Sequence, residues 1–133
     1  MSIQIEISVG ELLDKITILQ IKAERINDAE KLINIKKELQ VLQGQWEESP
    51  YGQTNLTESI LSLKDVNEKL WIIEDNIRNK ESRQQFDQEF IELARAVYFT
   101  NDIRAEIKRD INNKTGSDLV EEKSYSNYSE NNS

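Results

Sequence analysis

Residues 8–48 carry the feature that most constrains the fold, a nearly unbroken helical pattern. Ser8 and Glu11 form a Ser-x-x-Glu capping box directly before the apolar pattern begins, which is a start signal for a helix. A continuous helix of about 40 residues would be a rod of roughly 60 Å. Such a rod cannot bury its apolar side against itself. We therefore expect the rest of the chain, or a second copy of it, to cover this side.

The apolar side chains of this predicted rod lie on two different faces. The first half carries one stripe at helical spacing, made of Leu12, Ile16, Leu19, Ala23, Ile26 and Ile33. The second half carries another stripe on nearly the opposite side, made of Leu32, Ile35, Leu39, Leu42 and Trp46. Heptad drift of about 20° per repeat is too small to explain the change. Either the helix kinks near Ile33 or its two halves contact different neighbours, and we favour different neighbours.

The remainder of the chain predicts two further helices. Pro50 and Gly52 end the first helix. The next apolar stripe consists of Leu56, Ile60, Leu63, Val66, Leu70, Ile73 and Ile77. Residues 78–85 lack apolar side chains and predict a turn with a second capping box at Ser82 and Gln85; a continuous helix is the alternative. A last stripe at heptad spacing consists of Phe86, Phe90, Leu93, Val97, Thr100, Arg104, Ile107 and Ile111, and Gly116 suits the end of that helix.

The two ends of the chain differ from this pattern. The three isoleucines of residues 3–7 alternate with polar side chains, which is the period of a short half-buried strand; a segment lying over the bundle is the alternative. Residues 124–133 are rich in Ser, Asn, Tyr and Glu and predict a flexible polar tail. We therefore predict an all-α protein with one helical domain over residues 1–123. Its long first helix packs with an antiparallel helical hairpin as a coiled-coil-like three-helix bundle.

Leftover apolar side chains indicate a second copy. Leu61 and Ile72 lie opposite the apolar stripe of the second predicted helix. A two-helix hairpin would leave both exposed, so a third helix or a partner chain is expected to cover them. Together with the divided stripe of the first helix, they predict a homodimer.

Composition excludes several classes of function. The chain has 17 Lys and Arg against 25 Asp and Glu, a net charge of −8, which disfavours binding to nucleic acids and to anionic membranes. It has no cysteine and no histidine, which removes disulfides, thiol nucleophiles, Ser-His-Asp triads and ordinary zinc sites. No apolar run approaches the length of a membrane span, about 18 residues, and the acidic start does not fit a signal peptide. We expect a cytoplasmic protein without a metal or cofactor.

Polar residues on the last apolar stripe form the candidate binding site. Arg104 and Thr100 interrupt this stripe, and Arg95, Tyr98 and Asn101 lie nearby in the sequence. A guanidinium at such a position can hold a carboxylate or phosphate through two parallel hydrogen bonds. These residues are thus a candidate anion site. A structural ion pair, or an arginine whose stem packs while its head reaches water, is the alternative that the residue pattern favours.

One enzyme family has a similar plan. The all-helical chorismate mutases are small dimers with a long first helix, and they hold a dianionic substrate with Arg and Lys. Arg25 and Lys36 resemble in their spacing the cations on that family's first helix. An early arginine of the family is missing, and no Asp-x-x-Arg-Glu follows the first loop. The resemblance implies, as the alternative function, a small helical enzyme or binder for an anionic metabolite.

A closer resemblance covers nearly the whole chain. Residues 8–26, beginning Ser-Val-Gly-Glu-Leu-Leu-Asp-Lys, are similar to the opening of an uncharacterised family of small helical proteins from bacteria and cyanobacterial phages. Residues 66–75, 90–98 and 101–108 resemble its later blocks. The resemblance implies a cytoplasmic bacterial or phage setting and brings no activity, ligand or catalytic residue. On these grounds we predict a non-enzymatic interaction or assembly module that binds a second copy or an unknown protein partner.

Overall fold

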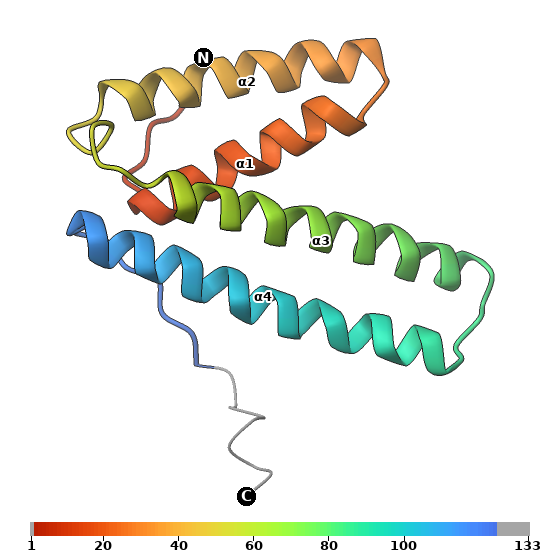
Figure 1. The fold of residues 1–133 in the computed structure, drawn as a ribbon. Helices are drawn as coiled ribbons and strands as arrows, with labels where there is room; N and C mark the ends of the chain where they lie inside the picture. The colour runs from red at the N-terminus through yellow and green to blue at the C-terminus, as the bar shows by residue number, and fades with distance from the viewer. Residues whose placement is uncertain (1, 125–133) are drawn as a thin grey trace, which may run out of the picture.

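The computed structural model describes residues 2–124 and contains four helices (Figure 1). They are α1 (Val9–Arg25), α2 (Ala29–Glu48), α3 (Thr57–Ser82) and α4 (Gln88–Thr115). The all-α prediction is confirmed. No strand forms within residues 2–124, so the predicted N-terminal strand is wrong, and Ile3 and Ile5 are exposed in an irregular segment. Most of the predicted polar tail, residues 125–133, lies outside the described residues.

The predicted 40-residue rod is wrong, because the chain turns between α1 and α2. Ile26 leaves the helix with an extended backbone, at φ −87° and ψ 132°. Asp28 then caps α2, and its carboxylate accepts hydrogen bonds from the backbone N–H groups of Glu30, at 3.0 Å, and Lys31, at 3.2 Å. The two helices run antiparallel and pack against each other (Figure 1). The break explains the divided stripe without a second copy, since Leu19 is buried and Leu39 packs against the core of the same chain.

The core lies where α1 meets α3 and α4. Its fully buried side chains include Leu13 of α1, Leu63 of α3 and Ile111 of α4. Helix α1 contacts all three other helices, whereas α2 has no buried residue and makes close backbone contact with α1 alone. Helix α2 therefore covers α1 from outside, and α1 is the central element of the fold.

Helices α3 and α4 form a second, longer hairpin. The predicted turn between them is confirmed, but the predicted capping box at Ser82 is wrong. Helix α3 continues through Ser82, Gln84 takes the left-handed φ of 53°, and Asp87 caps α4 by accepting from the backbone N–H of Phe90 at 3.0 Å. The predicted end of α4 is confirmed, because Gly116 adopts a left-handed φ of 65°.

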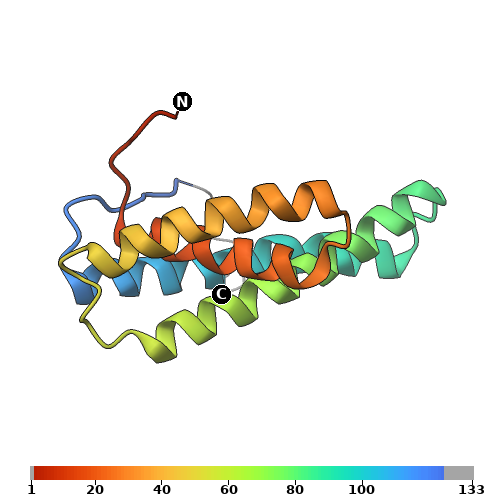
Figure 2. The same ribbon diagram turned by 90° about the horizontal axis from the view of Figure 1, so that it is seen from above.

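The turn end of this hairpin extends past the loop between α1 and α2, as both ribbon views show (Figures 1 and 2). We call its distal half, residues 72–98, the arm. The last buried residue of α3 is Asn67 and the first of α4 is Ile111, so no arm residue is fully buried. Leu61 and Ile72 are both exposed, and no helix within residues 2–124 covers them.

Candidate functional site

The first turn of α1 lies directly on α4. The backbone N–H of Gly10 donates to the side-chain oxygen of Asn112 at 2.7 Å. A Cβ atom at Gly10 would stand 2.6 Å from the carbonyl oxygen of Lys108, so only glycine permits this approach. The predicted start of the helix is confirmed, because Ser8 Oγ accepts from the backbone N–H of Glu11 at 3.1 Å. These contacts bring the charged first turn of α1 against the charged side of α4.

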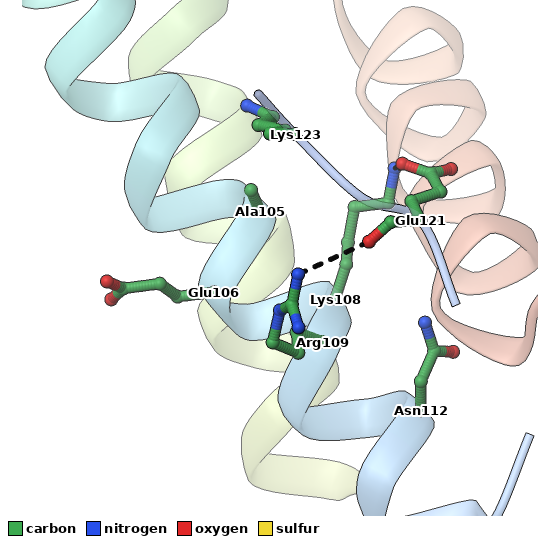
Figure 3. Close-up of a pocket in the computed structure, with 7 residues that line it drawn as sticks. All are labelled: Ala105, Glu106, Lys108, Arg109, Asn112, Glu121 and Lys123. Atoms are coloured by element: carbon green, nitrogen blue, oxygen red, sulfur yellow. Dashed lines mark hydrogen bonds and ion pairs between the residues drawn. The ribbon is translucent and has the colours of Figure 1, made fainter. Parts of the chain in front are cut away.

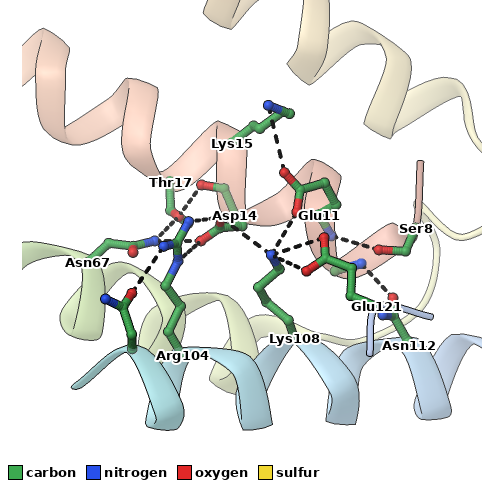
Figure 4. Close-up of polar contacts among 12 residues, drawn as sticks. Ser8, Glu11, Asp14, Lys15, Thr17, Asn67, Arg104, Lys108, Asn112 and Glu121 are labelled. Carbon is green, nitrogen blue, oxygen red and sulfur yellow. Dashed lines mark hydrogen bonds and ion pairs between the residues drawn. The ribbon is translucent and has the colours of Figure 1, made fainter. Parts of the chain in front are cut away.

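Beneath this contact lies a buried ion pair (Figure 4). Asp14 of α1 is 1% exposed, and Arg104 of α4 donates to both of its carboxylate oxygens, from Nε at 2.9 Å and from Nη2. Asn67 of α3 donates to Asp14 at 2.9 Å and to Thr17 Oγ1 at 3.0 Å. The third guanidinium nitrogen of Arg104 donates to Asn101 at 3.3 Å. The cluster thus ties three helices together through one carboxylate.

Hydrogen bonding keeps this cluster fully paired. Within the described residues, every buried side-chain nitrogen and oxygen has a partner. The hydrogen bonds to Asp14 raise the pKa of Arg104, which stays charged. A buried carboxylate requires such pairing, because a charge left unpaired in a protein interior is very unfavourable.

A second, more exposed group surrounds Lys108. Its ammonium lies 2.6 Å from a carboxylate oxygen of Glu11, 3.1 Å from one of Glu121 and 3.8 Å from one of Asp14. On the next position of α4, Arg109 pairs with Glu122 at 2.9 Å and donates to the backbone carbonyl of Glu121 at 3.4 Å (Figure 3). Helix α1, helix α4 and the segment after α4 all meet at this group.

The pKa values of two of its carboxyl groups are shifted in opposite directions. Hydrogen bonding with Glu121, with help from Lys108, lowers the pKa of Glu11 to about 2. The same hydrogen bonding, with burial, raises the pKa of Glu121. Glu121 is therefore the carboxyl group of the pair that takes up a proton first as the pH falls.

The structure brings together some of the predicted site residues and separates others. Arg104 and Asn101 are in contact, and Thr100 is half-buried one position before Asn101. The guanidinium of Arg95 instead lies over the ring of Phe99, 5.6 Å from its centroid, and the Tyr98 ring stands 5.1 Å from the same ring. Anion binding by this set stays a prediction. A ligand of Arg104 would have to replace Asp14.

The cluster around Asp14 does not follow from the predicted stripes. A single apolar stripe on residues 9–25 leaves out Asp14 and Thr17, and their partner Asn67 lies on another helix, α3. A signal was present, since Leu13, Thr17 and Ile21 stand four apart and mark a second buried flank of α1. A wide apolar face that includes one aspartate predicts a buried partner for that aspartate.

The pair of cations that resembled the chorismate mutases does not share a helix. Arg25 ends α1 and Lys36 lies on α2, and both are exposed. The turn at residues 26–28 removes the continuous first helix on which that likeness depended.

Comparisons with known proteins agree with the closer resemblance. A family model described as a family of unknown function, DUF6165, matches residues 3–133. No curated protein and no solved structure matches the chain. Among the described residues, no helix is long and apolar enough to cross a membrane, and no group of His, Cys, Asp and Glu is placed to hold a metal ion. The chain belongs to this family of unknown function, DUF6165.

Proposed function

We propose that this protein is a non-enzymatic interaction module that forms a homodimer through its arm. The observation that carries the proposal is the absence of any fully buried residue over residues 72–98, combined with exposed apolar side chains on the same segment. These exposed side chains include Ile72, Phe86, Ile91 and Tyr98.

The base of the α3–α4 hairpin suggests what the arm lacks. At the base, α1 packs on both helices and supplies Leu13 and Ile16 to a closed core. In the arm, two helices alone can each bury only the stripe that faces the other. Helical stability in proteins comes mainly from packing of such faces, so a bare two-helix segment gains most from additional helices. The arm of a second copy would supply two additional helices. A twofold axis would relate the two arms, and together they would form a four-helix bundle.

Aromatic side chains on the arm suit an interface. Phe86 packs edge-to-face on Phe90 with ring centroids 5.2 Å apart, and Phe86 remains 58% exposed. Aromatic residues are enriched in the cores of protein interfaces. The arm is shorter than the predicted rod, so we expect it to bury less than the standard 1,600 Å² or so and to associate weakly. The net charge of −8 favours other protein chains as partners over nucleic acids or anionic membranes.

Sedimentation velocity on the full chain tests the proposal. Between about 1 and 100 μM, the expected mass rises from that of one chain, 15.5 kDa, to about twice that value. Ile91→Lys places a charge on the arm, where Ile91 is 47% exposed, and should keep the protein monomeric. Ile33→Lys on α2, where the side chain is 68% exposed, is the matched control and should dimerise normally. Circular dichroism checks that both variants are folded. A wild-type chain that stays monomeric throughout, or an Ile91→Lys chain that dimerises as well as wild type, would overturn the proposal.

A further inference from the structure

After α4 ends, the chain folds back against the surface of that helix. Residues 117–124, which we call the strap, have no regular secondary structure (Figure 1). Two neighbouring acidic residues of the strap pair with two neighbouring cations of α4. Glu121 pairs with Lys108 at 3.1 Å, and Glu122 pairs with Arg109 at 2.9 Å. The strap therefore lies on α4 as an extended acidic segment. Its two consecutive carboxylates pair with two consecutive cations of the helix.

Only the beginning of the strap is fixed firmly. Ser117 donates its backbone N–H to the carbonyl of Asn112 at 3.0 Å, and its hydroxyl accepts from the backbone N–H of Val9 at 3.3 Å. Every residue from 118 to 124 is exposed, and the paired carboxylates of Glu121 and Glu122 are 55% and 74% exposed. Exposed ion pairs of this kind contribute little to stability. The distal part of the strap is thus held weakly.

The position of Glu11 disfavours binding of the strap to Lys108. Glu121 reaches Lys108 only by approaching Glu11, which already lies 2.6 Å from the same ammonium (Figure 4). A third carboxylate, that of Asp14, lies 3.8 Å from it. The like charge of Glu11 raises the cost of placing a carboxylate from the strap beside Lys108. An acidic segment that lay mainly against Arg109 would avoid part of this cost.

A shallow depression underlies the strap. It has a volume of about 100 Å³ and is lined by the exposed side of α4 and by the strap itself (Figure 3). The contributors from α4 include Ala105, Lys108, Arg109 and Asn112. With the strap displaced, this surface would present two cations and the small side chain of Ala105. That combination suits a peptide that carries adjacent carboxylates.

We propose that the face of α4 around Lys108 and Arg109 is a docking site for an extended acidic segment of a partner protein, and that the strap occupies it as an intramolecular ligand. The partner segment has the chemistry of the strap, two adjacent carboxylates that follow two apolar side chains, as in Leu119-Val120-Glu121-Glu122. It binds by displacing the strap. This inference is independent of the arm, which lies at the other end of α4.

Fluorescence anisotropy on the full chain tests this site. The probe is a labelled peptide with the sequence of residues 117–124, Ser-Asp-Leu-Val-Glu-Glu-Lys-Ser. The variant E121Q/E122Q removes both strap charges with little change in shape. If the strap occupies the site in about nine molecules of ten, this variant should bind the peptide about tenfold more tightly than wild type. A peptide with both glutamates replaced by glutamine is the control and should show no such gain.

A charge-reversal experiment distinguishes binding of the peptide at Arg109 from nonspecific electrostatic attraction. Adding Arg109→Glu to E121Q/E122Q should abolish the gain, and a peptide with arginine in place of its second glutamate should restore binding to that chain. Arg109 is 49% exposed, so its replacement is not expected to disturb the fold. Equal affinity of wild type and E121Q/E122Q for the peptide would overturn the proposal. So would an E121Q/E122Q chain whose tighter binding survives Arg109→Glu.

Discussion

Asp14 is the polar residue whose removal we expect to destabilise the fold strongly. Its side chain is almost completely buried, and it is paired to one arginine and one asparagine from two other helices. Asp14→Ala should lower the free energy of unfolding by about 3–5 kcal/mol, because it leaves the guanidinium of Arg104 without its counter-charge in a partly buried position. Urea unfolding of the full chain measures the change. Asp65→Ala, which removes an exposed carboxylate paired with Lys69, should cost less than about 1 kcal/mol. Similar losses for the two variants would show that the buried pair has no special weight.

Alanine substitutions at two helical glycines, Gly10 and Gly44, are expected to change the stability of the fold in opposite directions. Gly10→Ala places a Cβ atom 2.6 Å from a backbone oxygen of α4, and that backbone cannot move without shifting the helix. It should destabilise the protein by about 1–3 kcal/mol. A Cβ atom at Gly44 on α2 would meet nothing within 4 Å, so Gly44→Ala should stabilise by about 0.5–1 kcal/mol. Thermal unfolding of both variants measures the signs. A neutral Gly10→Ala would mean that α1 does not lie so close to α4.

At the scale of the helices, the start of α1 and the end of α4 were predictable from capping residues, whereas the starts of α2 and α4 were not. Ser8 and Gly116 stand at a helix start and a helix end by local chemistry, and both predictions are confirmed. Asn27 and Asp28 are also a local signal, but both residues are tolerated inside helices, and the apolar pattern continues on either side. The chain turns at residues 26–28 because α2 packs back onto α1. The site around Asp14 depends on that packing and was missed for the same reason.

The cap of α2 offers a direct measure of that turn. Asp28 is exposed and accepts from two backbone N–H groups of the first turn of α2. Asp28→Ala should destabilise the protein by about 1 kcal/mol, because these N–H groups lose their partner. Chemical denaturation measures the loss, and Asp75→Ala, an exposed position within α3, is the control with an expected change within about 0.5 kcal/mol. If Asp28→Ala were neutral, the turn would be held by packing alone.

At the scale of the whole molecule, α1 joins the other helices, and both charged and apolar contacts hold it on α4. The first turn of α1 meets α4 through Glu11 and Lys108, and the buried pair of Asp14 and Arg104 lies one helical turn further on. Apolar packing joins α1 to α3, to α2 and, through Ile107 and Ile111, to α4. Acid therefore weakens the ionic part of the α1–α4 contact and leaves its apolar part intact. The stability of the fold should depend on pH through the α1–α4 contact.

The pH dependence of stability can be assigned in part to Glu11. Its pKa falls from the ordinary 4.5 to about 2 in the folded chain, so its contribution is fully present above pH 4.5 and is lost as the pH falls toward 2. Glu11→Gln should therefore cost about 1–3 kcal/mol at pH 7, and the difference from wild type should shrink steadily below pH 4.5. The raised pKa of Glu121 has the opposite sign, because its contribution is present at low pH and fades as the pH rises through that raised value. Urea midpoints from pH 2.5 to 7 for wild type, Glu11→Gln and the exposed control Glu74→Gln separate these effects. A Glu11→Gln deficit that stayed constant down to pH 2.5 would show that the carboxylate of Glu11 does not hold α1 on α4 through its charge.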